Sequence, residues 1–250
     1  MGKGDRAKSA REKIELQRAA DRVRERRKKV VTYVTAGVVA LAAVGAGWWY
    51  TASRSQSEQA GEALAPITVQ PDGAVVMAKE GVTQPVVDIY EDFQCPACRE
   101  LERVSGATFK NLAAEGLAKV VYHPITIFSQ EPTKGNSLRA GAASRCVADG
   151  AQWMTFHDTL FENQPSEVVE GFKLEDLVEW GKDAGVTDPA FETCVTSQTH
   201  AQAQLDYSKK IGDEQKIEGT PTVKVNGTAI DNNVAFTPQE LRETVTEAAK

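Results

Sequence analysis

The sequence is poor in the side chains that usually bind metal ions. Its 250 residues include only three histidines and four cysteines. Structural zinc sites usually combine two cysteine pairs, or one cysteine pair with a histidine pair. Here Cys95 and Cys98 lie close together, whereas Cys146 and Cys194 are 48 positions apart and the histidines are scattered. We therefore expect no metal site and no other cofactor.

Charged residues are absent from one long stretch, residues 30–53. The 29 residues before it carry twelve Lys or Arg and five Asp or Glu, and Trp48-Trp49-Tyr50 lies near its far end. An apolar segment of about 20 residues with a basic and an aromatic flank is typical of a membrane-spanning helix. The sequence predicts a cytoplasmic N-terminal arm (1–29), a single transmembrane anchor (30–50) and an exported remainder. A signal peptide cleaved after Ala46 is the alternative.

The pattern Cys95-Pro96-Ala97-Cys98 follows the apolar run 86–90 and opens a segment with helical character. At such a strand-to-helix junction, free backbone N–H groups and the helix dipole favour a thiolate on the first cysteine. Pro96 suits the first helical position, which needs no N–H donor. Cys98 falls in the first turn, where it can attack a mixed disulfide formed by Cys95. The pattern predicts thiol–disulfide exchange with Cys95 as the nucleophile; an inert structural disulfide is the alternative.

The exported part is predicted to start with a flexible linker at 51–66 and to continue as one domain at 67–250. Hydrophobic patterning predicts four strand regions, at 74–78, 85–90, 118–128 and a hairpin at 222–230. Helices are predicted from Cys95 with a break near Gly106, through most of 129–218, and from Thr237 onward.

The even number of cysteines bears on their pairing. Disulfides persist outside the cytoplasm, so an exported chain with four cysteines favours two disulfides. The arrangement supports Cys95–Cys98 and Cys146–Cys194, although three pairings are formally possible. The second disulfide would stabilise the domain by about 4 kcal/mol in the chain-entropy model.

The predicted element order, with Cys-x-x-Cys opening the first helix of the domain, resembles the thioredoxin fold. Gly219-Thr220-Pro221-Thr222 adds to the resemblance, because thioredoxin-like proteins carry a cis-proline before a core strand. The long helical block is similar to the inserted domain of DsbA-like proteins. The implied fold class is α/β, a thioredoxin fold with an inserted all-helical domain at about 129–218, preceded by one transmembrane helix. The chain looks most like the membrane-tethered DsbA-like oxidoreductases of actinobacteria.

The resemblance also assigns roles to particular residues. It makes Cys95 the nucleophile, Cys98 the resolving thiol, and Thr220-Pro221 the platform on which an extended substrate pairs with exposed backbone. Members of the family often place an acidic residue beneath the disulfide to shuttle protons. Asp88 on the active-site strand is the first candidate and Asp92 the second; a solvated carboxylate at the strand end is the alternative for either.

The motif departs from DsbA at Ala97, where DsbA itself carries a histidine that stabilises the thiolate. Ala97 cannot donate that hydrogen bond, although the helix dipole remains. We therefore expect a reduction potential between those of thioredoxin and DsbA.

The resemblance implies two kinds of partner: unfolded exported proteins with free thiols, and a quinone-linked membrane reoxidant similar to vitamin K epoxide reductase. No nucleic-acid partner is expected, because basic residues beside a membrane span are usually topology signals. The predicted function is introduction of disulfides into exported proteins. Two alternatives stay open: a disulfide reductase or isomerase of the same fold, and a non-catalytic peptide-binding module.

Overall fold

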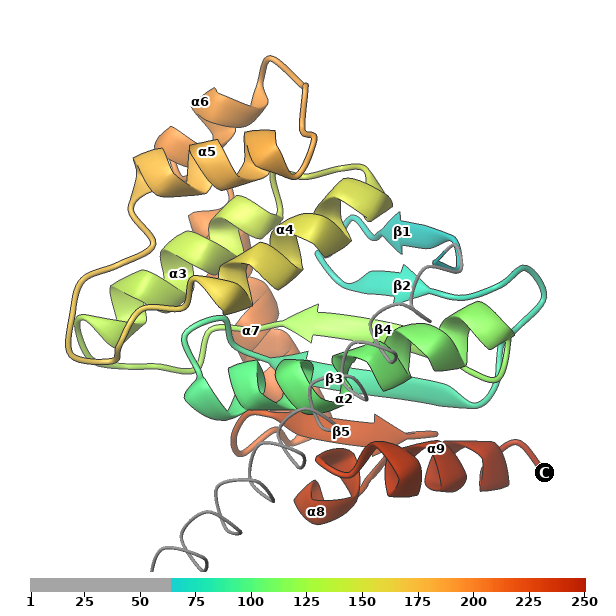
Figure 1. Ribbon diagram of the computed structural model, residues 1–250. Coiled ribbons are helices and arrows are strands. Elements are labelled where there is room, and N and C mark those ends of the chain that lie inside the picture. The colour runs from blue at the N-terminus through green and yellow to red at the C-terminus, as the bar shows by residue number, and fades with distance from the viewer. Residues whose placement is uncertain (1–63) are drawn as a thin grey trace, which may run out of the picture. The chain divides into compact units, whose positions relative to one another are not determined.

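Figure 1 shows the protein as a computed structural model, which describes residues 64–250. The predicted arm (1–29), the predicted anchor (30–50) and nearly all of the predicted linker (51–66) lie outside the described residues. Within residues 64–250, the helices are too short or too polar to cross a membrane.

A six-stranded sheet forms the centre of the domain, in the order β1-β2-β4-β3-β5-β6. Its central strand, β3 (Val86–Glu91), pairs in parallel with β4 (Lys119–Pro124) and antiparallel with β5 (Thr222–Val225). A strand with neighbours on both sides and helices on both faces must be largely apolar, which explains the run at 86–90. The outer strands are β1 (Ile67–Val69), β2 (Val75–Met77) and β6 (Thr228–Ala229).

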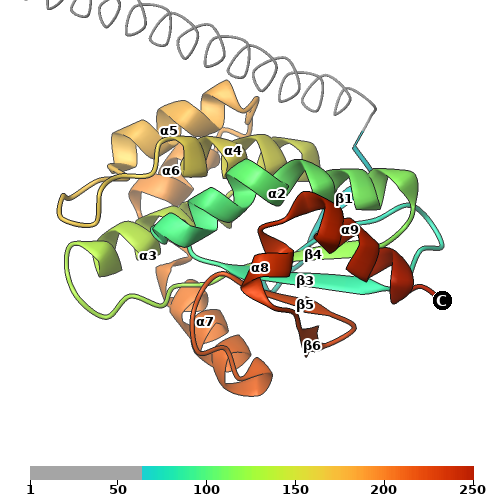
Figure 2. The same cartoon turned by 60° about the horizontal axis from the view of Figure 1, so that its bottom comes forward.

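The two faces of the sheet carry different helices (Figure 2). Helix α2 (Pro96–Glu115) connects β3 to β4 and lies on one face with α8 (Asn232–Ala235) and α9 (Pro238–Glu247), while α7 (Ala201–Gln215) lies on the other. Side chains alternate along a strand, so β3 contributes to both cores. Ile89 packs in the large core with Leu101 of α2, whereas Tyr90 belongs to a smaller cluster with Tyr207 of α7.

A block of helices lies between β4 and β5, as the resemblance to DsbA-like proteins implied. Apart from those of α7, its buried side chains join the core beneath α2, so most of this helical insertion shares one hydrophobic core with the sheet. The block consists of α3 (Thr133–Ser144), α4 (Gly150–Glu162), α5 (Leu174–Asp183), α6 (Phe191–Thr196) and α7.

Helix α2 runs unbroken through Gly106, so the predicted break is wrong. A Cβ atom at position 106 would lie 2.6 Å from Glu102 Oε2. The glycine therefore makes room for the Glu102 side chain, and packing compensates for its low helix propensity. Strand β1 was not predicted because its three residues are all at least partly exposed, unlike the buried β2. Helix α8 was not predicted because four residues are too few to show a helical period.

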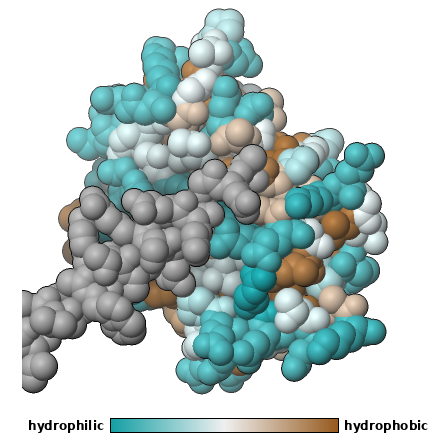
Figure 3. All heavy atoms as spheres, turned by 45° about the vertical axis from the view of Figure 1, so that its right-hand side comes forward, coloured by the Kyte–Doolittle hydropathy of each residue, from teal (hydrophilic) through white to brown (hydrophobic). Residues whose placement is uncertain are grey.

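Most large apolar side chains of the described residues are buried, and the exceptions are few. On the face that Figure 3 turns forward, hydrophobic residues form small patches among hydrophilic ones. Three of the four exposed large hydrophobic residues lie in the loops that flank α3 and precede α5: Ile127, Val168 and Val169.

Cys146 and Cys194 form a disulfide, the pairing that the even cysteine count supported. Their Cα atoms are 6.0 Å apart, and the bond ties the end of α3 to α6 within the helical insertion. Cys95 and Cys98 are free thiols in this structure.

The disulfide should stabilise the fold without taking part in catalysis. A cross-link between residues 48 positions apart restricts the unfolded chain by about 4 kcal/mol in the chain-entropy model. In a domain of this size the loss lowers the unfolding temperature by roughly 10 °C. We expect this shift in Cys146→Ala/Cys194→Ala when calorimetry is performed on the oxidised protein, with unchanged thiol exchange at Cys95. Loss of exchange at a temperature where the double variant stays folded would instead make the pair a redox relay.

Candidate active site

The Cys95 side chain lies at the point where β3 gives way to α2. Cys95 has extended backbone angles and caps the helix, and Pro96 takes the first helical position. The Cys95 carbonyl accepts a hydrogen bond from Arg99 N, at 3.2 Å. Its sulfur therefore lies beside the unpaired N–H groups of the first turn, at the positive end of the α2 dipole.

The pKa values of the two thiols are shifted in opposite directions. The pKa of Cys95 is lowered to about 6, chiefly by a hydrogen bond from the Cys98 thiol. The Thr220 hydroxyl and the backbone N–H groups of Cys98 and Ala97 also stabilise the thiolate, against the opposing effect of burial. Burial raises the pKa of Cys98 well above its usual value, and the neighbouring Cys95 adds to this effect. Cys95 is thus the more nucleophilic of the two thiols at neutral pH, and Cys98 keeps its proton.

The loop before β5 lies against the cysteine pair. The Thr220–Pro221 peptide bond is cis, and the Cys95 thiol donates to the Thr220 carbonyl oxygen at 3.3 Å. The Thr220 hydroxyl is buried without a hydrogen-bond partner in the described part of the chain, and it lies close enough to the sulfur to stabilise a thiolate there. Next to this loop lies a groove of about 630 Å³, lined by residues from the end of α7 to the start of α8, among them Gln215, Lys216, Thr222, Lys224 and Asn232.

Asp92 is the carboxyl group that the fold brings to the cysteine pair. It is fully buried and accepts hydrogen bonds from Gln94 N, Ile127 N and Ser137 Oγ, at 2.9, 2.9 and 2.7 Å. Burial raises the pKa of Asp92 to about 6; its hydrogen bonds oppose this effect, and the negative charge of Cys95 adds to it. The backbone N–H of Asp92 also faces the Cys98 sulfur.

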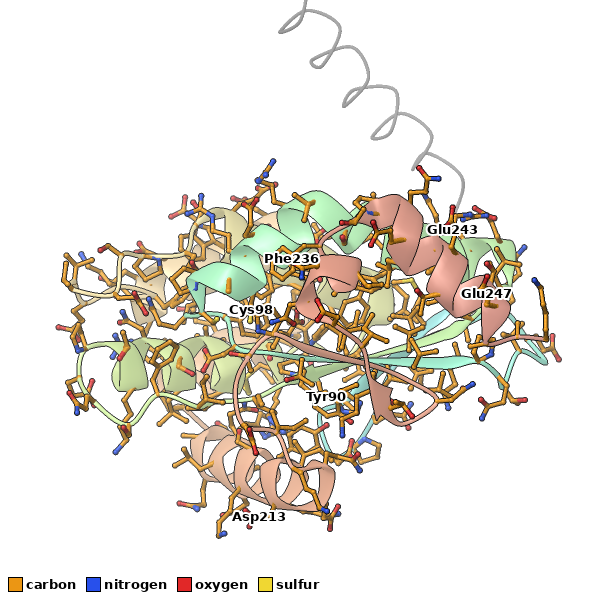
Figure 4. All side chains as sticks on the ribbon, turned by 90° about the horizontal axis from the view of Figure 1, so that it is seen from below. Tyr90, Cys98, Asp213, Phe236, Glu243 and Glu247 are labelled. Carbon is orange, nitrogen blue, oxygen red and sulfur yellow. A yellow bond between two sulfur atoms is a disulfide. The ribbon has the colours of Figure 1, made fainter. Side chains whose placement is uncertain are left out.

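Asp88, the first candidate for a proton shuttle, lies on the other face of the sheet. Its carboxylate pairs with His123 Nε2 at 2.9 Å, and His123 Nδ1 is 2.7 Å from the Tyr207 hydroxyl of α7. Figure 4 shows the two faces: Cys98 lies on the α2 side of the sheet, whereas Tyr90, which shares a face with Asp88, lies on the α7 side. The structure therefore separates Asp88 from the cysteines.

Sequence reasoning missed the contacts that the helical insertion makes with the active-site segment. Gln164 Nε2, just beyond α4, donates to the carbonyl oxygens of Phe93 and Cys95 at 2.7 and 2.9 Å. Gln94 Nε2 donates in turn to the Pro165 carbonyl oxygen at 3.0 Å. These residues are about 70 positions apart in the sequence, so no local pattern could have revealed the contacts.

Two groups of side chains in the described residues bring potential metal ligands within 4.8 Å of one another. One is Cys146, Cys194 and His200, in which the disulfide removes the thiolate ligands. The other is Glu91, Glu102 and His157, beneath the active-site strand.

Comparison with known proteins places this geometry in a family. Residues 81–247 match the family model described as thioredoxin. The structure of oxidised DsbA from Mycobacterium tuberculosis superposes with a TM-score of 0.59 at 30% identity, covering 74% of this chain and 92% of that one. The chain belongs to the thioredoxin family. Within it, the chain is DsbA-like.

Two curated relatives are more distant. Disulfide bond formation protein D of Bacillus subtilis is 25% identical over 201 residues, which cover 78% of this chain and 86% of the relative. A protein of Rickettsia bellii is 28% identical over 95 residues, 38% of this chain. The chain spans 37% of the length of that second relative.

The acidity of Cys95 can be measured directly. The ultraviolet absorbance of the thiolate in reduced protein should titrate with a midpoint near pH 6, well below the value of about 8.5 for an ordinary cysteine. Alkylation by iodoacetamide should rise through the same midpoint, because only the thiolate is nucleophilic. A midpoint at the ordinary value would show that the helix terminus and Cys98 do not stabilise the thiolate.

Matched variants assign the causes of this shift. Asp92→Asn should lower the midpoint further because it removes a negative charge beside Cys95, whereas Asp88→Asn, on the far face, should leave it unchanged. Thr220→Val should raise the midpoint through loss of a donor, and Thr222→Val, whose hydroxyl donates to Gly219 O, should not.

Proposed function

We propose that this protein is an extracytoplasmic thiol–disulfide oxidoreductase that introduces disulfides into exported proteins through the Cys95–Cys98 pair. The observation that carries the proposal is the contrast between the acidic Cys95 and the buried, proton-retaining Cys98 at the start of α2. Stabilising one thiolate favours the reduced pair, and a pair that is stable when reduced is an oxidant when it carries a disulfide.

The reaction follows from this contrast. In the oxidised protein a substrate thiolate attacks Cys95 Sγ; a bond forms between the two sulfurs, the Cys95–Cys98 bond breaks, and Cys98 leaves with the electron pair. A second substrate thiolate then attacks the substrate sulfur of the mixed disulfide. Cys95 leaves as a thiolate, which is favourable because leaving groups of low pKa depart faster. The substrate loses two electrons and two protons, and the pair gains both electrons.

Cys98 needs one of these protons, and we assign its delivery to Asp92. The Asp92 carboxyl group is buried with a pKa near neutrality, so it can both carry and release a proton. The position of Asp92 supports this role. Its carboxyl group is close enough to Cys95 for the two charges to repel each other, and its backbone N–H faces the Cys98 sulfur. The other proton goes to solvent.

The substrate class inferred is unfolded exported protein with free thiols. The Thr220 carbonyl beside the Cys95 sulfur and the groove lined by Thr220 and Pro221 suit an extended backbone. Exposed Ile127, Val168 and Val169 offer apolar contacts to an unfolded chain. Reoxidation of Cys95–Cys98 is assigned to a quinone-linked membrane protein similar to vitamin K epoxide reductase, on the resemblance alone.

Two alternatives differ from this proposal in their redox properties. A reductase or isomerase would share the chemistry but hold a disulfide of low potential, and a peptide-binding module would hold one that is hard to reduce. The low pKa of Cys95 favours the oxidase, while the alanine at position 97 limits how oxidising the pair becomes.

The direction of electron flow is tested by the reduction potential. A histidine at position 97 would donate a charge-assisted hydrogen bond of about 1.5–3 kcal/mol to the thiolate, equivalent to about 30–60 mV for this two-electron couple. We expect wild type to oxidise a reduced, unfolded substrate faster than it reduces insulin, and Ala97→His to have the higher potential in a glutathione redox titration.

Ala114→His, near the other end of α2, is the matched control and should leave the potential unchanged. A wild-type potential near that of thioredoxin, about −270 mV, with rapid insulin reduction, would assign the protein to the reductases.

The proposed location is tested by labelling. The basic arm before residue 30 and the apolar stretch that follows favour a single-pass protein whose N-terminus is cytoplasmic. In intact cells, a membrane-impermeant amine reagent should modify lysines of the 67–250 domain and leave the lysines of the 1–29 arm unmodified. Labelling of the arm, or recovery of the domain from the cytosol, would contradict the proposed topology.

A further inference from the structure

A buried group of three side chains joins the active-site strand to two helices. It consists of Glu91 at the end of β3, Glu102 on α2 and His157 on α4, and we call it the Glu–Glu–His cluster. Their carboxylate and imidazole ligand atoms lie within 4.8 Å of one another. Glu91 and His157 are fully buried, and Glu102 faces a neighbouring pocket. The reaction proposed above uses none of the three.

The cluster leaves acceptor atoms without partners. Glu91 Oε2 and Glu102 Oε1 are both buried, and neither has a hydrogen-bond partner within residues 64–250. The Tyr122 hydroxyl, which is close enough to sense both carboxylates, also lacks a partner there. Buried carboxylate oxygens are costly unless a positive charge or a donor compensates them. The cluster therefore has the oxygens of a cation site.

The orientation of the His157 ring points to the same conclusion. Its Nδ1 lies 3.0 Å from Asp158 Oδ1, while Lys110 holds the other oxygen of Asp158. This contact directs Nε2 at Glu91 Oε1, 2.8 Å away. A metal ion at the site would replace the Nε2 proton, while Nδ1 would keep its own proton toward Asp158. A carboxylate behind the imidazole is the usual arrangement around a metal-binding histidine.

We propose that Glu91, Glu102 and His157 form a binding site for a divalent transition-metal ion such as Zn²⁺. One imidazole and two carboxylates are a donor set that suits Zn²⁺ and related ions. Neighbouring N and O ligands of a tetrahedral ion are roughly 3.4 Å apart, so Glu91 Oε1 and His157 Nε2, which are 2.8 Å apart, would separate slightly on binding. Glu102 supplies the third ligand across the cluster.

An ion could reach this site from the pocket between α2 and α4. The pocket has a volume of about 340 Å³, and Glu102 lies in its wall. Water molecules from the pocket would complete the coordination shell. Its charged lining is balanced, with three basic and three acidic side chains: Arg99, Arg103, Lys110, Glu102, Asp158 and Glu162.

Two carboxylates, Glu91 and Glu102, would face the ion, whereas Asp158 already pairs with Lys110. Coordination would fix the end of β3 to α2 and to α4 of the helical insertion, next to the active-site segment but not through the cysteines. Such a site is structural, and its existence does not depend on the direction in which Cys95–Cys98 transfers electrons.

Metal binding is tested on the untagged full-length chain in detergent, oxidised so that Cys95 and Cys98 cannot bind the ion. Titration with Zn²⁺ against a chromophoric chelator should give one equivalent bound, and EDTA should lower the unfolding temperature. Glu102→Gln removes a ligand and should weaken binding at least 10-fold. Asp158→Asn, which leaves the ligands in place, should weaken it roughly 10- to 100-fold.

Glu162→Gln is the matched control, because Glu162 lines the same pocket outside the cluster; it should bind Zn²⁺ as wild type does. Co²⁺ should give a visible spectrum in wild type and Glu162→Gln but not in Glu102→Gln. Failure of oxidised wild type to bind Zn²⁺, or equal binding by Glu102→Gln, would overturn the proposal and leave a proton between Glu91 and His157 instead.

Discussion

The central position of β3 is the constraint on which the site depends. Pairing with β4 on one side and β5 on the other fixes the end of β3, and the chain then turns directly into α2. Because β5 is held against β3, the loop before it brings Thr220 and Pro221 to the Cys95 sulfur. Cys95 and Thr220 of the cis-proline loop, 125 residues apart, thus meet through one strand.

Buried polar contacts bind the helical insertion to the active-site segment. Asp92 accepts a hydrogen bond from Ser137 of α3, and Glu91 pairs with His157. Gln94 donates to the Pro165 carbonyl oxygen, and Gln164 donates to the Phe93 carbonyl oxygen. Burying such groups without a partner costs free energy. Each pair therefore favours the one position of the insertion, relative to the active-site segment, in which the pair can form. The insertion is therefore part of the site, because it supplies the donors that hold the residues preceding Cys95.

Much of this arrangement could be predicted from the sequence. The strand before Cys95, the capping position of Cys95, the proline at 221, the helical insertion and the Cys146–Cys194 pair each have a local or arithmetic signal. No such signal in the sequence decides between Asp88 and Asp92 as the carboxyl group near the cysteines. Alternation shows that Asp88 and Ile89 face opposite ways, but only the packing of α2 decides which face carries the cysteines. The Glu91–His157 pair joins residues 66 positions apart and has no sequence signature.

The acidity of Cys95 shows how a fold can compensate for a missing side chain. Ala97 offers no side-chain donor, yet four other donors lower the pKa of Cys95: the Cys98 thiol, the Thr220 hydroxyl and two backbone N–H groups. Three of these four donors belong to the motif itself: the two N–H groups come with any helix that begins at Cys95, and the thiol comes from Cys98. The fourth comes from the loop that carries the cis-proline. In the proposed reaction, a substrate that docks on this loop acts on the same hydroxyl that stabilises the thiolate, so docking and leaving-group acidity are coupled at Thr220.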